Sequence, residues 1–139
     1  MKPSVFIDSN IWFSAFYKEG LCSKLLEKIQ TLGWKTHISE LVLDEVVRNI
    51  QLKIPTTLSL FVDYLKVNKI IVLKNPTSSQ LLPYNELAEK HDLPILASAI
   101  EFKCDYLLTG NLKDFNIQRV KKKAKITLIS PKELWAELL

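Results

Sequence analysis

Val5-Phe6-Ile7-Asp8-Ser9-Asn10 is the stretch that decides the fold, because a short apolar run ends in Asp-Ser-Asn and an aromatic-rich helical pattern follows at once. A run of this length and character is typical of a strand buried on both faces, as in a parallel sheet. Ser9 or Asn10 is expected to cap the helix that follows. Asp8 would then lie at the carboxyl end of an inner strand, where α/β folds place their ligand crevices. Taken alone, its carboxylate could equally be a helix cap.

The composition limits the class of protein. The chain has 139 residues, is 47% hydrophobic and contains only 3 Gly, which is typical of one folded domain spanning 1–139. No apolar run reaches the ~20 residues that cross a bilayer, and the N-terminus lacks a signal-peptide pattern. We therefore expect a cytoplasmic protein with no membrane partner. Cys22 and Cys104 lack zinc-type spacing and are expected to be buried free thiols.

The net charge of +4 is mild, but basic residues crowd one stretch near the C-terminus: Arg119, Lys121, Lys122, Lys123 and Lys125. Such a run is most simply a solvated helix surface. It becomes a candidate nucleic-acid contact only if a phosphate-handling site lies nearby.

Short strands and helices alternate along the chain, which predicts a parallel sheet with right-handed crossovers and helices on both faces. The strands are expected at residues 5–7, 35–38, 69–73, 106–108 and 126–129. The helices are expected at residues 11–17, 21–32, 40–52, 58–67, 85–90, 94–103 and 131–139. Residues 75–79 form the most linker-like piece, although the piece is too short to be a domain boundary.

Further polar residues are placed to join Asp8. Glu45 falls inside the apolar arc of its helix, where a carboxylate is costly unless it is paired or binds a cation. The alternative is a border residue that reaches water. Asp92 precedes a Pro-initiated helix, where an N-cap is the default role. Thr109 and Asn111 lie in the turn after a predicted strand, so they could share one sheet edge with Asp8.

These stretches resemble the PIN domain, a family of metal-dependent ribonucleases. The strand ending Asp8-Ser9-Asn10, the helix after Ser39 with Glu45, Asp92-x-Pro94 and the run from Asp105 to Phe115 look like the family's four motifs, in order, over essentially the whole chain. The resemblance implies a PIN-like three-layer α/β/α sandwich with a mostly parallel sheet of about five strands. It also implies hydrolysis of single-stranded RNA, as in the toxin halves of toxin–antitoxin pairs.

By the same resemblance, Asp8, Glu45 and Asp92 are expected to be catalytic and to bind Mg²⁺ or Mn²⁺, with Asn10 and Thr109 in support. A divalent ion suits this chemistry because it activates water and neutralises the phosphate charge that develops in the transition state. The residues expected to contact RNA are Lys113, Arg119, Lys121, Lys122 and Lys123. An antitoxin protein and a second copy of the chain, as a homodimer, are the expected protein partners.

One position departs from the family pattern. Asn111 stands where the family most often has Asp, and Asp114 is the nearest carboxylate. Either residue could be the fourth metal ligand. We favour Asn111, which can hold a metal-bound water, because a shift of three residues along a turn usually points a side chain elsewhere.

Two other classes of function stay open. A PIN-like module that binds RNA or a protein partner without cleaving RNA is favoured by the neutral Asn111. A nucleotide-binding α/β protein is disfavoured, because the sequence contains no Gly-rich phosphate loop.

Overall fold

A five-stranded sheet forms the centre of the computed structural model, which describes residues 2–139. The strands are β1 (Ser4–Ile7), β2 (Lys35–Ser39), β3 (Ile71–Leu73), β4 (Tyr106–Leu108) and β5 (Thr127–Ile129). They lie in the order β3-β2-β1-β4-β5, and every neighbouring pair is parallel. The predicted fold class is therefore confirmed, with a sheet that is wholly parallel.

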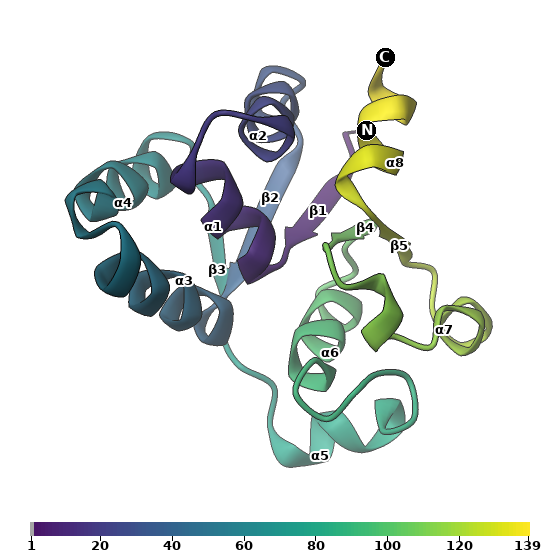
Figure 1. Cartoon of the computed structure of the whole chain (residues 1–139). Coiled ribbons are helices and arrows are strands. Elements are labelled where there is room, and N and C mark those ends of the chain that lie inside the picture. Colours follow the sequence, from purple (N-terminus) through teal and green to yellow (C-terminus); the bar gives the residue numbers. More distant parts are fainter. Residues whose placement is uncertain (1) are drawn as a thin grey trace.

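Helices cover both faces of this sheet. They are α1 (Ser9–Tyr17), α2 (Leu21–Thr31), α3 (Glu40–Lys53), α4 (Leu58–Val67), α5 (Ser78–Leu81), α6 (Leu93–Glu101), α7 (Ile117–Lys123) and α8 (Pro131–Leu138). Figure 1 shows α1 to α4 on one side of the strands and α5 to α7 on the other. Right-handed crossovers require this arrangement, because the chain moves outward from β1 to β3 and then returns to β4 in the opposite direction.

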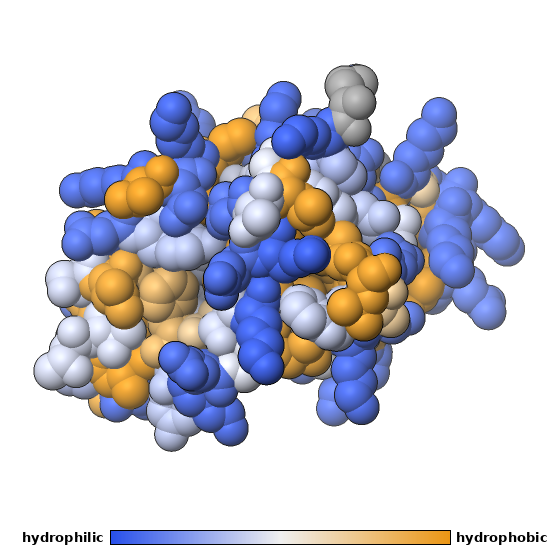
Figure 2. Space-filling model, turned by 90° about the horizontal axis from the view of Figure 1, so that it is seen from above, coloured by the Kyte–Doolittle hydropathy of each residue, from blue (hydrophilic) through white to orange (hydrophobic). Residues whose placement is uncertain are grey.

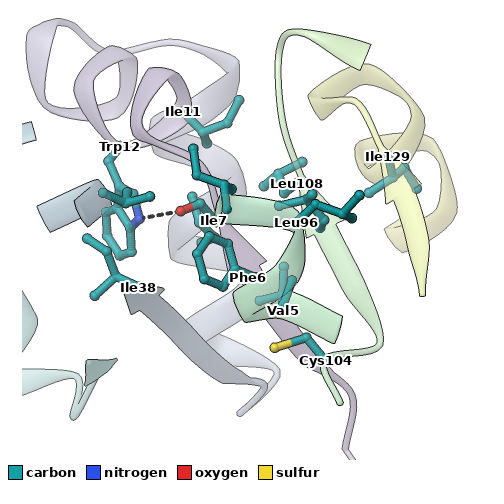
Figure 3. Packing of buried hydrophobic residues seen from close by; sticks show 14 of the residues in the cluster. Val5, Phe6, Ile7, Ile11, Trp12, Ile38, Leu96, Cys104, Leu108 and Ile129 are labelled. Carbon is teal, nitrogen blue, oxygen red and sulfur yellow. Dashed lines mark hydrogen bonds between the residues drawn. The ribbon is translucent and has the colours of Figure 1, made fainter. Parts of the chain in front are cut away.

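The central strand β1 is buried on both faces, as its apolar run predicts. Val5, Phe6 and Ile7 are all fully buried, and the indole Nε1 of Trp12 donates a hydrogen bond of 3.0 Å to the carbonyl oxygen of Ile7 (Figure 3). Trp12 also meets Phe61 of α4 edge-to-face, with ring centroids 5.9 Å apart. The start of α1 is thus fixed to the end of β1 by packing and by a hydrogen bond.

The aromatic residues of α1 divide between core and surface. Trp12 is fully buried, Phe13 and Phe16 pack against the core, and Tyr17 is 56% exposed. Of the two free thiols, Cys104 is buried, as expected, whereas Cys22 is only partly buried. None of the helices within residues 2–139 is long and apolar enough to span a bilayer.

The helix expected at residues 85–90 is absent, and that prediction was wrong. This stretch is a turn followed by an isolated bridge between Ala88 and Phe115, whereas α5 and a short 3-10 helix (Leu82–Tyr84) precede it. The backbone N–H of Glu89 donates to the carbonyl oxygen of Asp114, and that of Asn116 donates to Leu87. Pairing with a distant segment therefore replaces local helix formation here.

The strand order reverses direction between β1 and β4. The chain leaves β1 toward β2 on one side and leaves β4 toward β5 on the other. Such a reversal separates the connections at the carboxyl ends of the two strands, where open α/β sheets bind their ligands. Asp8 follows β1 at this point and Thr109 follows β4.

Candidate active site

Asp8 occupies the carboxyl end of β1 and is only 2% exposed. Its backbone N–H donates to the carbonyl oxygen of Leu108 at 3.0 Å, which continues the pairing of β1 with β4. Its Oδ1 accepts a hydrogen bond of 2.7 Å from the backbone N–H of Ser9 and so caps α1. Asp8, and not Ser9 or Asn10, is therefore the cap, because α1 begins at Ser9, two residues earlier than the helix expected from residue 11.

The turn after β4 holds the second oxygen of Asp8. The Thr109 hydroxyl donates to Oδ2 of Asp8 at 2.8 Å and is itself fully buried. The backbone N–H of Gly110 donates to Oδ1 of Asn10 at 2.9 Å. A Cβ at Gly110 would lie 3.2 Å from that same oxygen, so a glycine permits this close approach. Asn10 and Thr109 thus fix the orientation of the Asp8 carboxylate and the turn beside it.

Glu45 reaches the same place from α3. Ser39 caps that helix by accepting a hydrogen bond from the backbone N–H of Val42. The Ser9 hydroxyl donates to Oε2 of Glu45 at 2.9 Å, and Glu45 is partly buried, as its position inside the apolar arc predicts. The sequence predicted Ser9 only as a helix cap. Its position directly after Asp8 was the only sign that its hydroxyl could also contact a second acidic side chain.

Asp92 precedes α6 and is 6% exposed. It holds the N-cap position, yet its carboxylate makes no capping hydrogen bond. Burial raises the pKa of Asp92 to about 6, and the neighbouring carboxylates of Asp8 and Asp114 add to this rise by repulsion. Burial also raises the pKa of Asp8, with Glu45 contributing a smaller repulsion against its hydrogen bonds from Thr109 and Ser9. The acidic side chains therefore interact electrostatically.

The carboxylate of Asp114 lies near Asp92 and adds to the rise in its pKa. Asn111 is exposed and donates its backbone N–H to the Thr109 hydroxyl. The choice of Asn111 over Asp114 as the fourth ligand stays a prediction. The structure shows that Leu112–Asp114 form a 3-10 helix. With three residues per turn, such a helix returns position 114 to the side of position 111.

The predicted RNA contacts fall into two groups. Arg119 Nη1 lies 2.6 Å from Oε2 of Glu86, and Lys123 Nζ donates to the carbonyl oxygen of Pro83. Both side chains thus have intramolecular partners, which sequence reasoning did not foresee. Lys113, Lys121 and Lys122 are exposed. Figure 2 shows long hydrophilic side chains projecting at the edge where α7 lies in Figure 1.

The donor set is made of hard oxygen ligands, which suit Mg²⁺ or Mn²⁺ better than softer metals. Burial and, to a smaller extent, repulsion by Asp8 and Asp114 raise the pKa of Asp92, and a bound cation would offset both. Within residues 2–139, however, no three acidic, histidine or cysteine side chains are grouped tightly enough to form a ready-made ion site. The carboxylates converge on one edge of the sheet and would need to close around an ion.

The fold and this edge of the sheet define a PIN-like α/β sandwich. Comparison with solved structures agrees. One similar structure is a chain of the VapBC2 complex from Rickettsia felis, which is bound to a DNA fragment from its promoter. The two chains share 20% sequence identity and align with a TM-score of 0.63, over 91% of this chain and 97% of that one. Another is a chain of DNA-bound VapBC from Salmonella typhimurium, with 15% identity, a TM-score of 0.59 and coverage of 93% and 98%.

At these identities the likeness shows the fold. No family model matches the sequence, and no curated protein matches it either.

Proposed function

We propose that this protein is a divalent-metal-dependent endoribonuclease that hydrolyses phosphodiester bonds of single-stranded RNA. The observation that carries the proposal is the convergence of buried Asp8 and Asp92 with Asp114 at the carboxyl ends of β1 and β4. Clustered carboxylates would repel both one another and an RNA backbone, so the cluster is useful only when it is charge-compensated.

Mg²⁺ or Mn²⁺ would be held by Asp8, Glu45, Asp92 and Asp114, with Asn111 at the rim as a weaker, neutral oxygen donor. The ion supplies an activated water and neutralises charge on the reacting phosphate. We prefer Asp114 to Asn111 as the fourth ligand, because Asp114 is partly buried and its charge raises the pKa of Asp92, whereas Asn111 is exposed.

The other residues of the site orient the carboxylates and attract the RNA. Thr109 holds one oxygen of Asp8, and Ser9 holds one oxygen of Glu45, so neither carboxylate is free to turn away. Lys113 stands beside Asp114 in the same turn, and Lys121 and Lys122 are exposed on α7. These cations would attract the RNA backbone to the rim of an acidic crevice.

We extend the proposal to the partners. Both similar structures are VapBC complexes, and the resemblance to PIN-domain toxins implies an antitoxin for this chain. A hollow of about 790 Å³ between α1, α2 and α4 could receive a segment of such a partner, since Phe16, Leu26, Leu60 and Val67 line it. A homodimer and a cytoplasmic location belong to the same proposal.

The test is cleavage of a single-stranded RNA by the pure protein with Mg²⁺, with Mn²⁺ and with a chelator. We expect cleavage only with a divalent ion, and its loss in Asp8→Asn, which keeps the cap to Ser9 but lowers the charge of the site. Asp44→Asn is the matched control, because Asp44 is exposed on α3 and lies outside the site. An active Asp8→Asn enzyme would contradict the assignment.

RNA binding without divalent-dependent cleavage would instead favour the alternative, a PIN-like module that binds RNA or a partner and has lost catalysis.

A further inference from the structure

A hollow of about 610 Å³ lies beside the acidic side chains. One wall comes from the segment before α6, through Glu86, Ala88 and Glu89, and the other from residues 112–118. Asp114 lines this hollow, and Glu89 links it to the proposed reaction site, because the backbone of Glu89 donates to the carbonyl oxygen of Asp114 and accepts from the N–H of Asp92, both at 2.9 Å.

The two walls are tied together by backbone hydrogen bonds. The N–H of Glu89 donates to the carbonyl oxygen of Asp114 at 2.9 Å, and the N–H of Asn116 donates to Leu87 at 2.7 Å. The ion pair of Arg119 with Glu86 adds a side-chain link between the same two segments. These links hold the two walls of the hollow at a fixed separation before any ligand binds.

The side chains that line the hollow suit a nucleobase better than a phosphate. The carboxylates of Glu89 and Asp114 would repel a phosphate group, whereas Ala88, Phe115 and Ile117 offer an apolar lining. The amide of Gln118 and the ammonium of Lys113 add donors at the exposed rim. Single-stranded RNA presents such a mixed, flat group when its bases are unstacked.

We propose that this hollow binds the nucleobase next to the bond that is cleaved and prefers guanine; the proposal rests on the RNA hydrolysis proposed above. Glu89 recognises the base through its carboxylate. An ionised carboxylate only accepts hydrogen bonds, through two oxygens. Guanine alone among the four bases presents two adjacent N–H donors, at N1 and N2, on its Watson–Crick edge. Glu86 is the weaker candidate, since its Oε2 is already paired with Arg119.

The first experiment compares cleavage of a randomised pool of short single-stranded RNAs by the wild type and by Glu89→Gln, with the cut sites read by sequencing. We expect the wild type to favour guanine about tenfold or more at one position flanking the cut, and Glu89→Gln to lose most of that preference. The Glu89 side chain is exposed, so Gln should not disturb folding. Glu137→Gln, an exposed change on α8, is the matched control and should keep the wild-type preference.

The second experiment does not depend on cleavage. Guanosine 5′-monophosphate should shift the NMR signals of backbone amides in residues 113–118 of the wild type, and uridine 5′-monophosphate, which carries the same phosphate, should shift them several-fold less. Glu89→Gln should remove the difference. Equal responses to the two nucleotides, or a guanine preference that survives in Glu89→Gln, would overturn the proposal. A guanine-selective response in a protein that cleaves no RNA would support the base site and refute the proposed ribonuclease.

Discussion

Ser9 stands between two acidic side chains that come from different elements. Its backbone N–H donates to Asp8 at 2.7 Å, while its hydroxyl donates to Glu45 at 2.9 Å. The cap needs only the backbone, whereas the contact with Glu45 and a longer one of 3.5 Å to Oδ1 of Asp8 need the hydroxyl. A side-chain substitution can therefore separate capping of α1 from the orientation of Glu45.

We expect Ser9→Ala to weaken Mn²⁺ binding by about tenfold or more, because loss of a hydrogen bond that orients a metal ligand typically has an effect of that size. Ser9→Thr keeps a hydroxyl and should bind Mn²⁺ much as the wild type does. Isothermal titration calorimetry of the three proteins measures the affinities. Equal affinities for Ser9→Ala and the wild type would show that Glu45 is held by other contacts or does not bind the ion.

Sequence reasoning located individual acids better than their contacts. Asp8, Glu45 and Asp92 were singled out by the end of an apolar run, by a helical arc and by a residue before Pro94, which are all local patterns. The orientation of Asp114 depends on a short 3-10 helix that no local sequence pattern predicted. The same holds for Ser9, whose contact with Glu45 joins residues that are 36 positions apart.

At the scale of elements, the strands were predictable and the region before α6 was not. Short apolar runs with β-branched or aromatic residues mark β1, β4 and β5 without any knowledge of their partners. Residues 85–90 have no hydrophobic period long enough to decide between a helix and a turn. Their conformation is set by hydrogen bonds to Asp114 and Asn116, which the sequence brings close only after folding.

Helix α7 carries the basic stretch and gives a prediction about RNA binding. Lys121 and Lys122 are exposed, whereas Lys123 donates to the carbonyl oxygen of Pro83. If Lys121 and Lys122 contact phosphates, Lys121→Gln and Lys122→Gln should each reduce the slope of log affinity against log salt by about 0.7. Lys123→Gln should change the slope less, because this ammonium already has a partner. The slope is measured from RNA binding over a salt series, and no change in any variant would assign α7 to the solvated surface.

At the scale of the whole molecule, the acidic cluster affects the pH dependence of folding. Burial and repulsion raise the pKa of Asp92 from its ordinary value of 3.8 to about 6 in the folded state. Between these values the folded protein keeps a proton that the unfolded chain has lost, so stability falls as the pH rises through this window. Burial lowers the pKa of His37, and this shift opposes the effect of Asp92 because it weakens the fold as the pH falls below about 6.5.

The contribution of Asp92 is therefore isolated by comparing the wild type with Asp92→Asn, since His37 is the same in both. In metal-free buffer containing a chelator, we expect the variant to melt a few degrees above the wild type at pH 7, where the wild type carries the full repulsion. The two melting temperatures should converge as the pH falls toward 4, because the wild-type carboxyl group is then protonated in the folded state. Thermal unfolding followed by circular dichroism at half-unit pH steps measures the difference. A variant that is less stable than the wild type at every pH would mean that the Asp92 carboxylate stabilises the fold and that its raised pKa does not reflect repulsion within an ion-binding site.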